Sequence, residues 1–250
     1  MPEDPVPPRA SRVERIAALL GLSDEVREAR SAPDGRADAA RMVLLEQVEV
    51  TRTVLEATVA ELDCESERSL QIASYLQARK DRWTTRFTIS SVVVGAATTI
   101  VSGLLLGANT NVTAQEVVAV SGGALAAGLA LVPLFDHPRM EIRHERNPLA
   151  DVWRGPRVSS TFPEVVWAYL ARPEFSNKQS QSIRSNVVAR WQEYQRHGTD
   201  VDVELLFSSG GRYDAANLYL RTAMLEQVKA EVRLMNQDLA TLVAAPSARR

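Results

Sequence analysis

Two of the three histidines have a spacing that suggests chemistry. His137 and His144 lie seven residues apart with Glu141 between them, so a helix would place three metal-ligating side chains on one face. Pro138 opposes that geometry, because the residue before a proline is driven out of the helical conformation. Nearby arginines also repel a cation. We therefore expect a solvated or headgroup-contacting basic segment here rather than a metal site.

Cys64 is the single cysteine, which excludes an intrachain disulfide and a cysteine-based zinc site. The carboxylates on either side of it disfavour the thiolate, which is the form that a nucleophile needs. Catalysis by this thiol is therefore not expected. The surrounding acidic residues predict an exposed helical face, with partner binding as the alternative: Glu56, Glu61, Asp63, Glu65 and Glu67.

The glycine motifs of nucleotide and hydrolase sites do not occur in the sequence: there is no P-loop, no GxGxxG and no GxSxG. Gly210 and Gly211 precede a predicted helix start at Asp214, where a carboxylate disfavours a bound anion, so we predict a turn. The net charge of −2 gives no excess of basic residues for nucleic acid. We expect no enzymatic activity, no cofactor, no metal and no nucleic-acid partner.

Two apolar segments, roughly Thr88–Ala108 and Val117–Phe135, contain no charged residue. A helix of about 20 residues extends about 30 Å, which is the thickness of a hydrocarbon core. The short polar linker Asn109–Gln115 joins the two segments. The pattern predicts a transmembrane helical hairpin, with the lipid bilayer as its partner.

Basic residues border both segments, and the linker between the segments contains none. The positive-inside rule then predicts a multi-pass protein of the cell (inner) membrane with both termini in the cytoplasm. The N-terminus has no signal-peptide pattern, so we expect the first apolar segment to direct insertion. The predicted membrane-interface residues are Arg79, Lys80, Arg82, Arg86, Arg139, Arg143 and Arg146.

Small residues recur at helical spacing in both apolar segments. In lipid, close approach of helix backbones stabilises helix pairs, because apolar burial offers little advantage there. We expect packing within the hairpin, with oligomerisation through one of these faces as the alternative. The predicted packing positions are Gly103, Gly107, Ala119, Gly123 and Ala127.

The stretch from Ala37 to Arg86 has neither proline nor glycine and predicts a long amphipathic helix. Its seam steps by three and four residues, as in a coiled coil, but polar positions weaken it, so a partner helix is expected. The seam contains Leu44, Val48, Thr51, Leu55, Thr58, Leu62, Glu65, Ser69, Ile72 and Leu76.

A second seam of the same kind follows the predicted N-cap Asp214. It contains Leu218, Arg221, Leu225, Val228, Val232, Met235, Leu239 and Leu242. Our hypothesis is that the two long helices pack antiparallel, and two parallel homo-oligomeric coiled coils are the alternative.

Three capping boxes predict the starts of shorter helices: Ser11–Glu14, Thr161–Glu164 and Ser176–Gln179. No run alternates apolar and polar residues with period two, so strands are not expected and the fold class is all-α. The predicted regions are a proline-rich disordered leader (1–10), N-terminal helices (11–86), the hairpin (87–136) and a C-terminal cytoplasmic helical bundle (137–250).

These features predict a non-enzymatic membrane anchor or scaffold whose cytoplasmic helices bind a protein partner or self-associate. The alternative is a small oligomeric channel, or a membrane-disrupting effector, that uses the hairpin. A pore needs a wet face, and the hairpin offers only uncharged hydroxyls for one: Ser91, Thr98, Thr99, Ser102 and Ser121.

Overall fold

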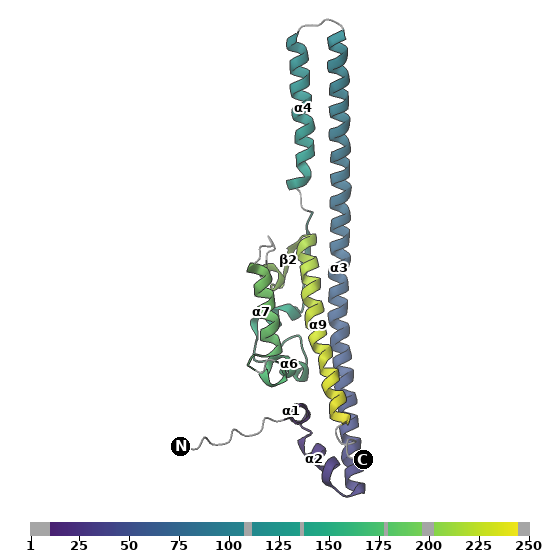
Figure 1. Cartoon of the computed structure of the whole chain (residues 1–250), viewed down its shortest axis with the longest axis vertical. Coiled ribbons are helices and arrows are strands. Elements are labelled where there is room, and N and C mark those ends of the chain that lie inside the picture. The colour runs from purple at the N-terminus through teal and green to yellow at the C-terminus, as the bar shows by residue number, and fades with distance from the viewer. Residues whose placement is uncertain (1–10, 108–111, 136–137, 178–179, 197–202, 245–250) are drawn as a thin grey trace, which may run out of the picture. The chain divides into compact units, whose positions relative to one another are not determined.

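The computed structural model describes residues 11–107, 112–135, 138–177, 180–196 and 203–244 (Figure 1). The chain is mostly helical, as the sequence predicts. The predicted leader and part of the predicted linker lie outside the described residues. The elements are α1 (Arg12–Leu20), α2 (Ser23–Ser31), α3 (Asp34–Gly107), α4 (Val112–Phe135), β1 (Met140–Arg143), α5 (Pro148–Arg154), α6 (Glu164–Ala171), the 3-10 helix η1 (Pro173–Phe175), α7 (Ile183–Arg196), α8 (Val203–Leu206), β2 (Gly210–Tyr213) and α9 (Ala215–Ala244).

The chain divides into two compact units. Unit 1 contains residues up to Ser69, the segment Arg143–Gly210, and the chain from Leu220 onward. Unit 2 contains Leu70–Ile142 and Gly211–Tyr219, and therefore holds both apolar segments. The N-terminal and C-terminal helices thus belong to one folded body.

The core of unit 1 lies between α3 and α9, which run side by side (Figure 1). Ser66 contacts Glu226 and Asp63 contacts Lys229, so residues earlier in α3 meet residues later in α9. This order confirms the hypothesis of antiparallel packing. Leu55 and Leu225 are fully buried, like most of the apolar residues of both predicted seams.

The polar positions of the α3 seam are buried without breaking the helix. Thr51, Thr58 and Ser69 each donate the side-chain hydroxyl hydrogen to the backbone carbonyl four residues earlier, at 2.8 Å. This local bond satisfies the hydroxyl group, so it needs no partner on the facing helix. The weak positions of the seam are therefore compatible with a buried interface.

The first helix begins at its predicted capping box. The Glu14 backbone N–H donates to Ser11 Oγ at 3.2 Å, and the Ser11 backbone N–H donates to the Glu14 carboxylate at 2.7 Å. Gly21, with φ of 72°, ends α1 in the left-handed conformation that favours glycine. At the other end of the chain, the Asn217 backbone N–H donates to Asp214 Oδ1 at 2.9 Å, so Asp214 is confirmed as an N-cap.

The expectation of no strands is wrong. β1 and β2 form a two-stranded sheet, and the His144 N–H donates to the Ser209 carbonyl at 2.8 Å beside it. Each strand has only four residues, which is too short for a recognisable alternation. Gly210, predicted to lie in a turn, begins β2 with φ of 137°.

The capping box predicted at Thr161 is also wrong. Pro163 is the N-cap of α6 and makes no side-chain cap, while the Thr161 hydroxyl donates to Asp151 at 2.9 Å. Asp151 also accepts hydrogen bonds from Ser159 and Ser160. Burial by itself would raise the pKa of Asp151, but these hydrogen bonds lower the pKa below its ordinary value. Thr161 therefore bonds to a carboxylate of α5 instead of capping the start of α6.

The helix predicted after Ser176 begins later than expected. Residues 178–179 of that box lie outside the described residues, and Ser182 Oγ accepts the Ser185 backbone N–H just before α7. Ser176 Oγ instead accepts the side-chain amide of Asn186 at 2.9 Å. The serine side chain thus joins the η1 loop to α7.

Candidate functional site: an exposed apolar hairpin with a basic border

Large apolar side chains of α4 and of the C-terminal part of α3 are exposed in the structure. Of the described helices, α3 is the one that is long and apolar enough to cross a membrane by length and composition. Its most apolar 18-residue stretch has a mean hydropathy of 1.7, and none of that stretch is buried. α4 contributes a shorter apolar run, Val120–Leu131. Contiguous exposed apolar surface of this kind marks an interaction site.

The exposure continues on both helices. Val92 is 64% exposed on α3 and Val120 is 72% exposed on α4. Further large apolar side chains are exposed on the same two helices: Ile89, Val93, Ile100, Val101, Leu104, Val117, Leu125 and Leu131.

The two apolar helices approach each other closely at one glycine. A Cβ atom added at Gly122 would lie 2.2 Å from Thr98 Oγ1, so α4 can meet α3 here because this residue has no side chain. Added at Gly103 or at Gly123, a Cβ atom would meet nothing within 4 Å. The contact within the chain thus lies one residue from the predicted Gly123.

The other predicted packing positions make no described contact that tests them. Ala127 is exposed, and the surroundings of Gly107 and of the Ala119 side chain lie outside the described part of the structure. Packing of these faces against a second copy of the chain stays a prediction.

The hydroxyl groups of the hairpin are turned toward their own helices. Ser91, Thr98 and Thr99 donate to backbone carbonyls three or four residues earlier, at 2.7 to 2.9 Å. Ser121 donates to the Val117 carbonyl at 2.6 Å. Such local bonds let a hydroxyl group lie in an apolar environment without water.

Of the predicted interface residues, Arg79, Lys80, Arg82 and Arg86 lie on α3, just before the apolar stretch. Arg139 is exposed and precedes β1. Beside the first group, Trp83 and Phe87 have ring centroids 5.5 Å apart. This arrangement places aromatic and cationic side chains at one end of the apolar surface.

The last two predicted interface residues lie in unit 1. Arg143 is exposed at the end of β1. Arg146 Nη1 lies 3.0 Å from the Glu61 carboxylate, and its other amino group donates to the Thr161 carbonyl. Arg146 therefore joins α3 to the loop before α6.

Unit 1 holds a buried polar cluster that sequence reasoning missed. The Arg221 side chain is fully buried and donates to Asn147 Oδ1 at 3.1 Å and to the Glu65 carboxylate at 3.3 Å. The Asn147 amide donates to the carbonyls of Leu206 and Ser208 at 2.9 and 2.7 Å. The cluster therefore connects α3, α9, the start of α5 and the end of α8.

His144 belongs to this cluster. Its Nδ1 atom lies 3.7 Å from Glu65 Oε2, and the side chain is 3% exposed. Burial, and then the charges of Arg221 and Arg68, lower the pKa of His144 to about 4. The imidazole is thus neutral at neutral pH. Our expectation of a solvated basic segment is wrong for this residue.

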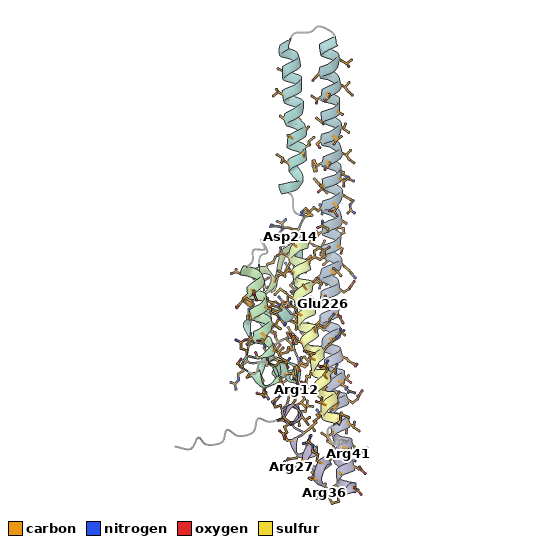
Figure 2. The ribbon with its side chains drawn as sticks, in the orientation of Figure 1. Arg12, Arg27, Arg36, Arg41, Asp214 and Glu226 are labelled. Carbon is orange, nitrogen blue, oxygen red and sulfur yellow. The ribbon has the colours of Figure 1, made fainter. Side chains whose placement is uncertain are left out.

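Two acidic residues of the predicted exposed face of α3 pair with basic residues of α9. Asp63 contacts Lys229 and Arg233, and Glu65 contacts Arg221. Ser66 Oγ donates to Glu226 at 2.8 Å (Figure 2). The interpretation of this stretch as an exposed face is wrong for Glu65, whose side chain is 23% exposed. Asp63 is paired but 45% exposed, and Glu56, Glu61 and Glu67 are exposed as predicted. The sequence did contain a sign of the Glu65–Arg221 pair. The α3 seam carries one charged residue, Glu65, and the α9 seam carries one of opposite charge, Arg221.

Among the described residues, no group of three His, Cys, Asp or Glu side chains could hold a metal ion. A cavity of about 420 Å³ is lined by Arg12, Tyr169 and Arg190, among others. Its arginines are already paired, Arg12 with the buried Asp238, and Arg190 with Glu231 at 2.7 Å. These pairs hold α1 and α7 against α9.

The features that distinguish this chain are therefore the exposed apolar surface and the basic residues beside it. Comparison with protein families, curated proteins and solved structures finds no match to this chain.

Proposed function

We propose that the chain is an integral membrane anchor, in which α4 and the apolar part of α3 cross the bilayer as a hairpin. The observation that carries the proposal is that no residue in the most apolar stretch of α3 is buried. In water such a surface would drive aggregation, whereas in a bilayer it contacts acyl chains. The helical backbone satisfies its own polar groups, as a lipid-exposed segment requires.

We further propose that unit 1 acts as a cytoplasmic scaffold that binds another protein or a second copy of the chain. The two seams are buried in its core, while the apolar side chains of Met42, Leu45 and Val50 are exposed on α3. Large exposed side chains of this kind are suited to a protein interface.

A channel is the less supported function. Four of the five hydroxyl groups that a wet face would need bond to the backbone of their own helix. Hydroxyls held in this way have already used their one hydrogen, so they offer only acceptor sites to a polar path. The anchor requires no such path and fits the apolar surface on both helices.

Membrane extraction and thiol labelling test the anchor and its topology together. Cys64 is exposed, so native folding does not shield the thiol from reagents. In cells, the protein should resist extraction by alkaline carbonate, and a membrane-impermeant maleimide should label Cys64 only after lysis. In a Cys64→Ser background, Asn111→Cys should be labelled in intact cells.

Two outcomes would contradict the proposal, and a third would invalidate the assay. Release by carbonate would mean that the hairpin does not span the membrane. Labelling of Cys64 in intact cells, with the linker cysteine protected, would invert the topology and exclude the cytoplasmic scaffold. Labelling of neither thiol after denaturation would mean that the reagent failed, so a denatured control is run in parallel.

A further inference from the structure

Four basic residues lie close together on α3, at the start of the apolar surface. In unit 1, Arg27, Arg36 and Arg41 are exposed, yet each is paired with a carboxylate (Figure 2). In the described part of the chain, the side chains of Arg79, Lys80, Arg82 and Arg86 make no ion pair with any acidic residue. Their positive charges are therefore not compensated by a carboxylate in the described part of the chain, and a ligand outside the chain can pair with them.

The helix places three of these residues on one face. Arg79, Arg82 and Arg86 step by three and four residues, so their side chains follow one another along α3. Trp83 lies beside them and is 42% exposed. The eight residues from Arg79 to Arg86 extend about 10 Å along the helix axis, which is enough to span the headgroup layer of one leaflet.

The chemistry of this face fits a phosphate in a lipid environment. A guanidinium group binds phosphate oxygens through two parallel hydrogen bonds, and phosphate carries the opposite charge. Tryptophan favours the boundary between headgroups and acyl chains. The apolar surface that begins at Ile89 continues directly from the basic face, so one ligand can contact both.

We infer that Arg79, Arg82 and Arg86, assisted by Lys80, form a binding surface for the headgroups of anionic phospholipids. The inference rests on the proposed membrane anchor and adds a preference among lipids to it. Each basic residue near an anionic leaflet is attracted by about 1 kcal/mol, which corresponds to about a fivefold preference per residue.

Lipid composition around the full-length protein tests this inference. The protein is placed in membranes of phosphatidylcholine mixed with phosphatidylglycerol and extracted as polymer-bounded discs, and the lipids in the discs are counted by mass spectrometry. We expect phosphatidylglycerol to be enriched over the bulk membrane, with an enrichment that falls as salt is raised. Inorganic phosphate, added as a soluble competitor, should not abolish the enrichment if the lipid is the ligand.

The decisive variant is Arg79→Gln/Arg82→Gln/Arg86→Gln, which should lower the enrichment to the bulk ratio. The matched control is Arg27→Gln/Arg36→Gln/Arg41→Gln, which removes the same charge from exposed but paired positions. This variant should enrich phosphatidylglycerol as the parent does. The lysine variant Arg79→Lys/Arg82→Lys/Arg86→Lys should keep part of the enrichment, since it retains the charge without the bidentate geometry.

The inference is overturned if the glutamine variant enriches phosphatidylglycerol as the parent does, or if the control loses the enrichment equally. It is also overturned if phosphate competes fully. Carbonate extraction of the same samples separates the two proposals. If the parent protein stays in the membrane but shows no enrichment, the proposed anchor stands and the inferred lipid preference is wrong. If carbonate releases the parent protein, the proposed membrane anchor is itself wrong.

Discussion

Units 1 and 2 use the same helical structure but treat their side chains in opposite ways. In unit 1, Leu55 and Leu225 are fully buried, and the charged groups facing the core are paired. In unit 2, Val92 and Val120 are exposed, and the hydroxyls bond to their own helices. Unit 1 therefore stabilises itself by burial within the chain. The hairpin needs an apolar phase from outside, which the proposed bilayer would supply.

Among the variants proposed here, Leu55→Asp should cause the largest loss of stability, and it tests the burial of the core of unit 1. The new carboxylate would be buried in the α3–α9 core without a partner, at a cost on the order of 4 kcal/mol. The free energy of unfolding, followed by circular dichroism during denaturation in mild detergent, measures the loss. The matched control is Leu45→Asp, since Leu45 lies on the same helix but is 52% exposed. Equal loss in both variants would mean that the seam is not the core.

Arg221→Met should be the next most damaging change. It leaves the Glu65 carboxylate and the Asn147 amide without their buried cation, which should cost about 3 kcal/mol. Arg233→Met is the control, because that side chain is exposed and its ion pair should contribute less than about 1 kcal/mol. In the double variant with Glu65→Leu, part of the loss should be recovered. Additive losses would show that the two charges are not coupled.

Acid should destabilise unit 1 through His144. In the unfolded chain the imidazole gains a proton as the pH falls below about 6.5, whereas in the fold its pKa is about 4. The folded state therefore binds fewer protons between these values, and stability falls by about 3 kcal/mol as the pH drops from 6.5 to 4. The His144→Gln variant should lose this pH dependence. If its unfolding free energy follows pH as the parent's does, the histidine is not the responsible group.

The smallest of these effects is expected in the hairpin. Gly122→Ala would place a Cβ atom against Thr98 and should lower thermal stability in detergent by the equivalent of about 1 kcal/mol. At Gly103, where an added Cβ atom meets nothing, alanine should be neutral or stabilising because it favours helix. A greater loss for Gly103→Ala would point to contact between copies of the chain, which light scattering in detergent would detect.

The sequence by itself determined the local features of this protein. The burial of Leu44, Val48 and Leu239 follows from steps of three and four residues, which place side chains on one helix face whatever that face contacts. The caps at Ser11 and Asp214 are local for the same reason, since each hydrogen bond spans three residues.

Only the tertiary structure decided which distant residues meet. Glu65 and Arg221 are far apart in the chain, and each separately resembled a flaw in a seam until the antiparallel packing brought them together. The same holds for the four-residue strands, for Thr161 beside Asp151, and for the choice of Gly122 over its neighbour. The helical pattern repeats every few residues, so the sequence predicts which residues share one face of a helix. A partner depends on the register between elements, which is set by the packing of the whole unit.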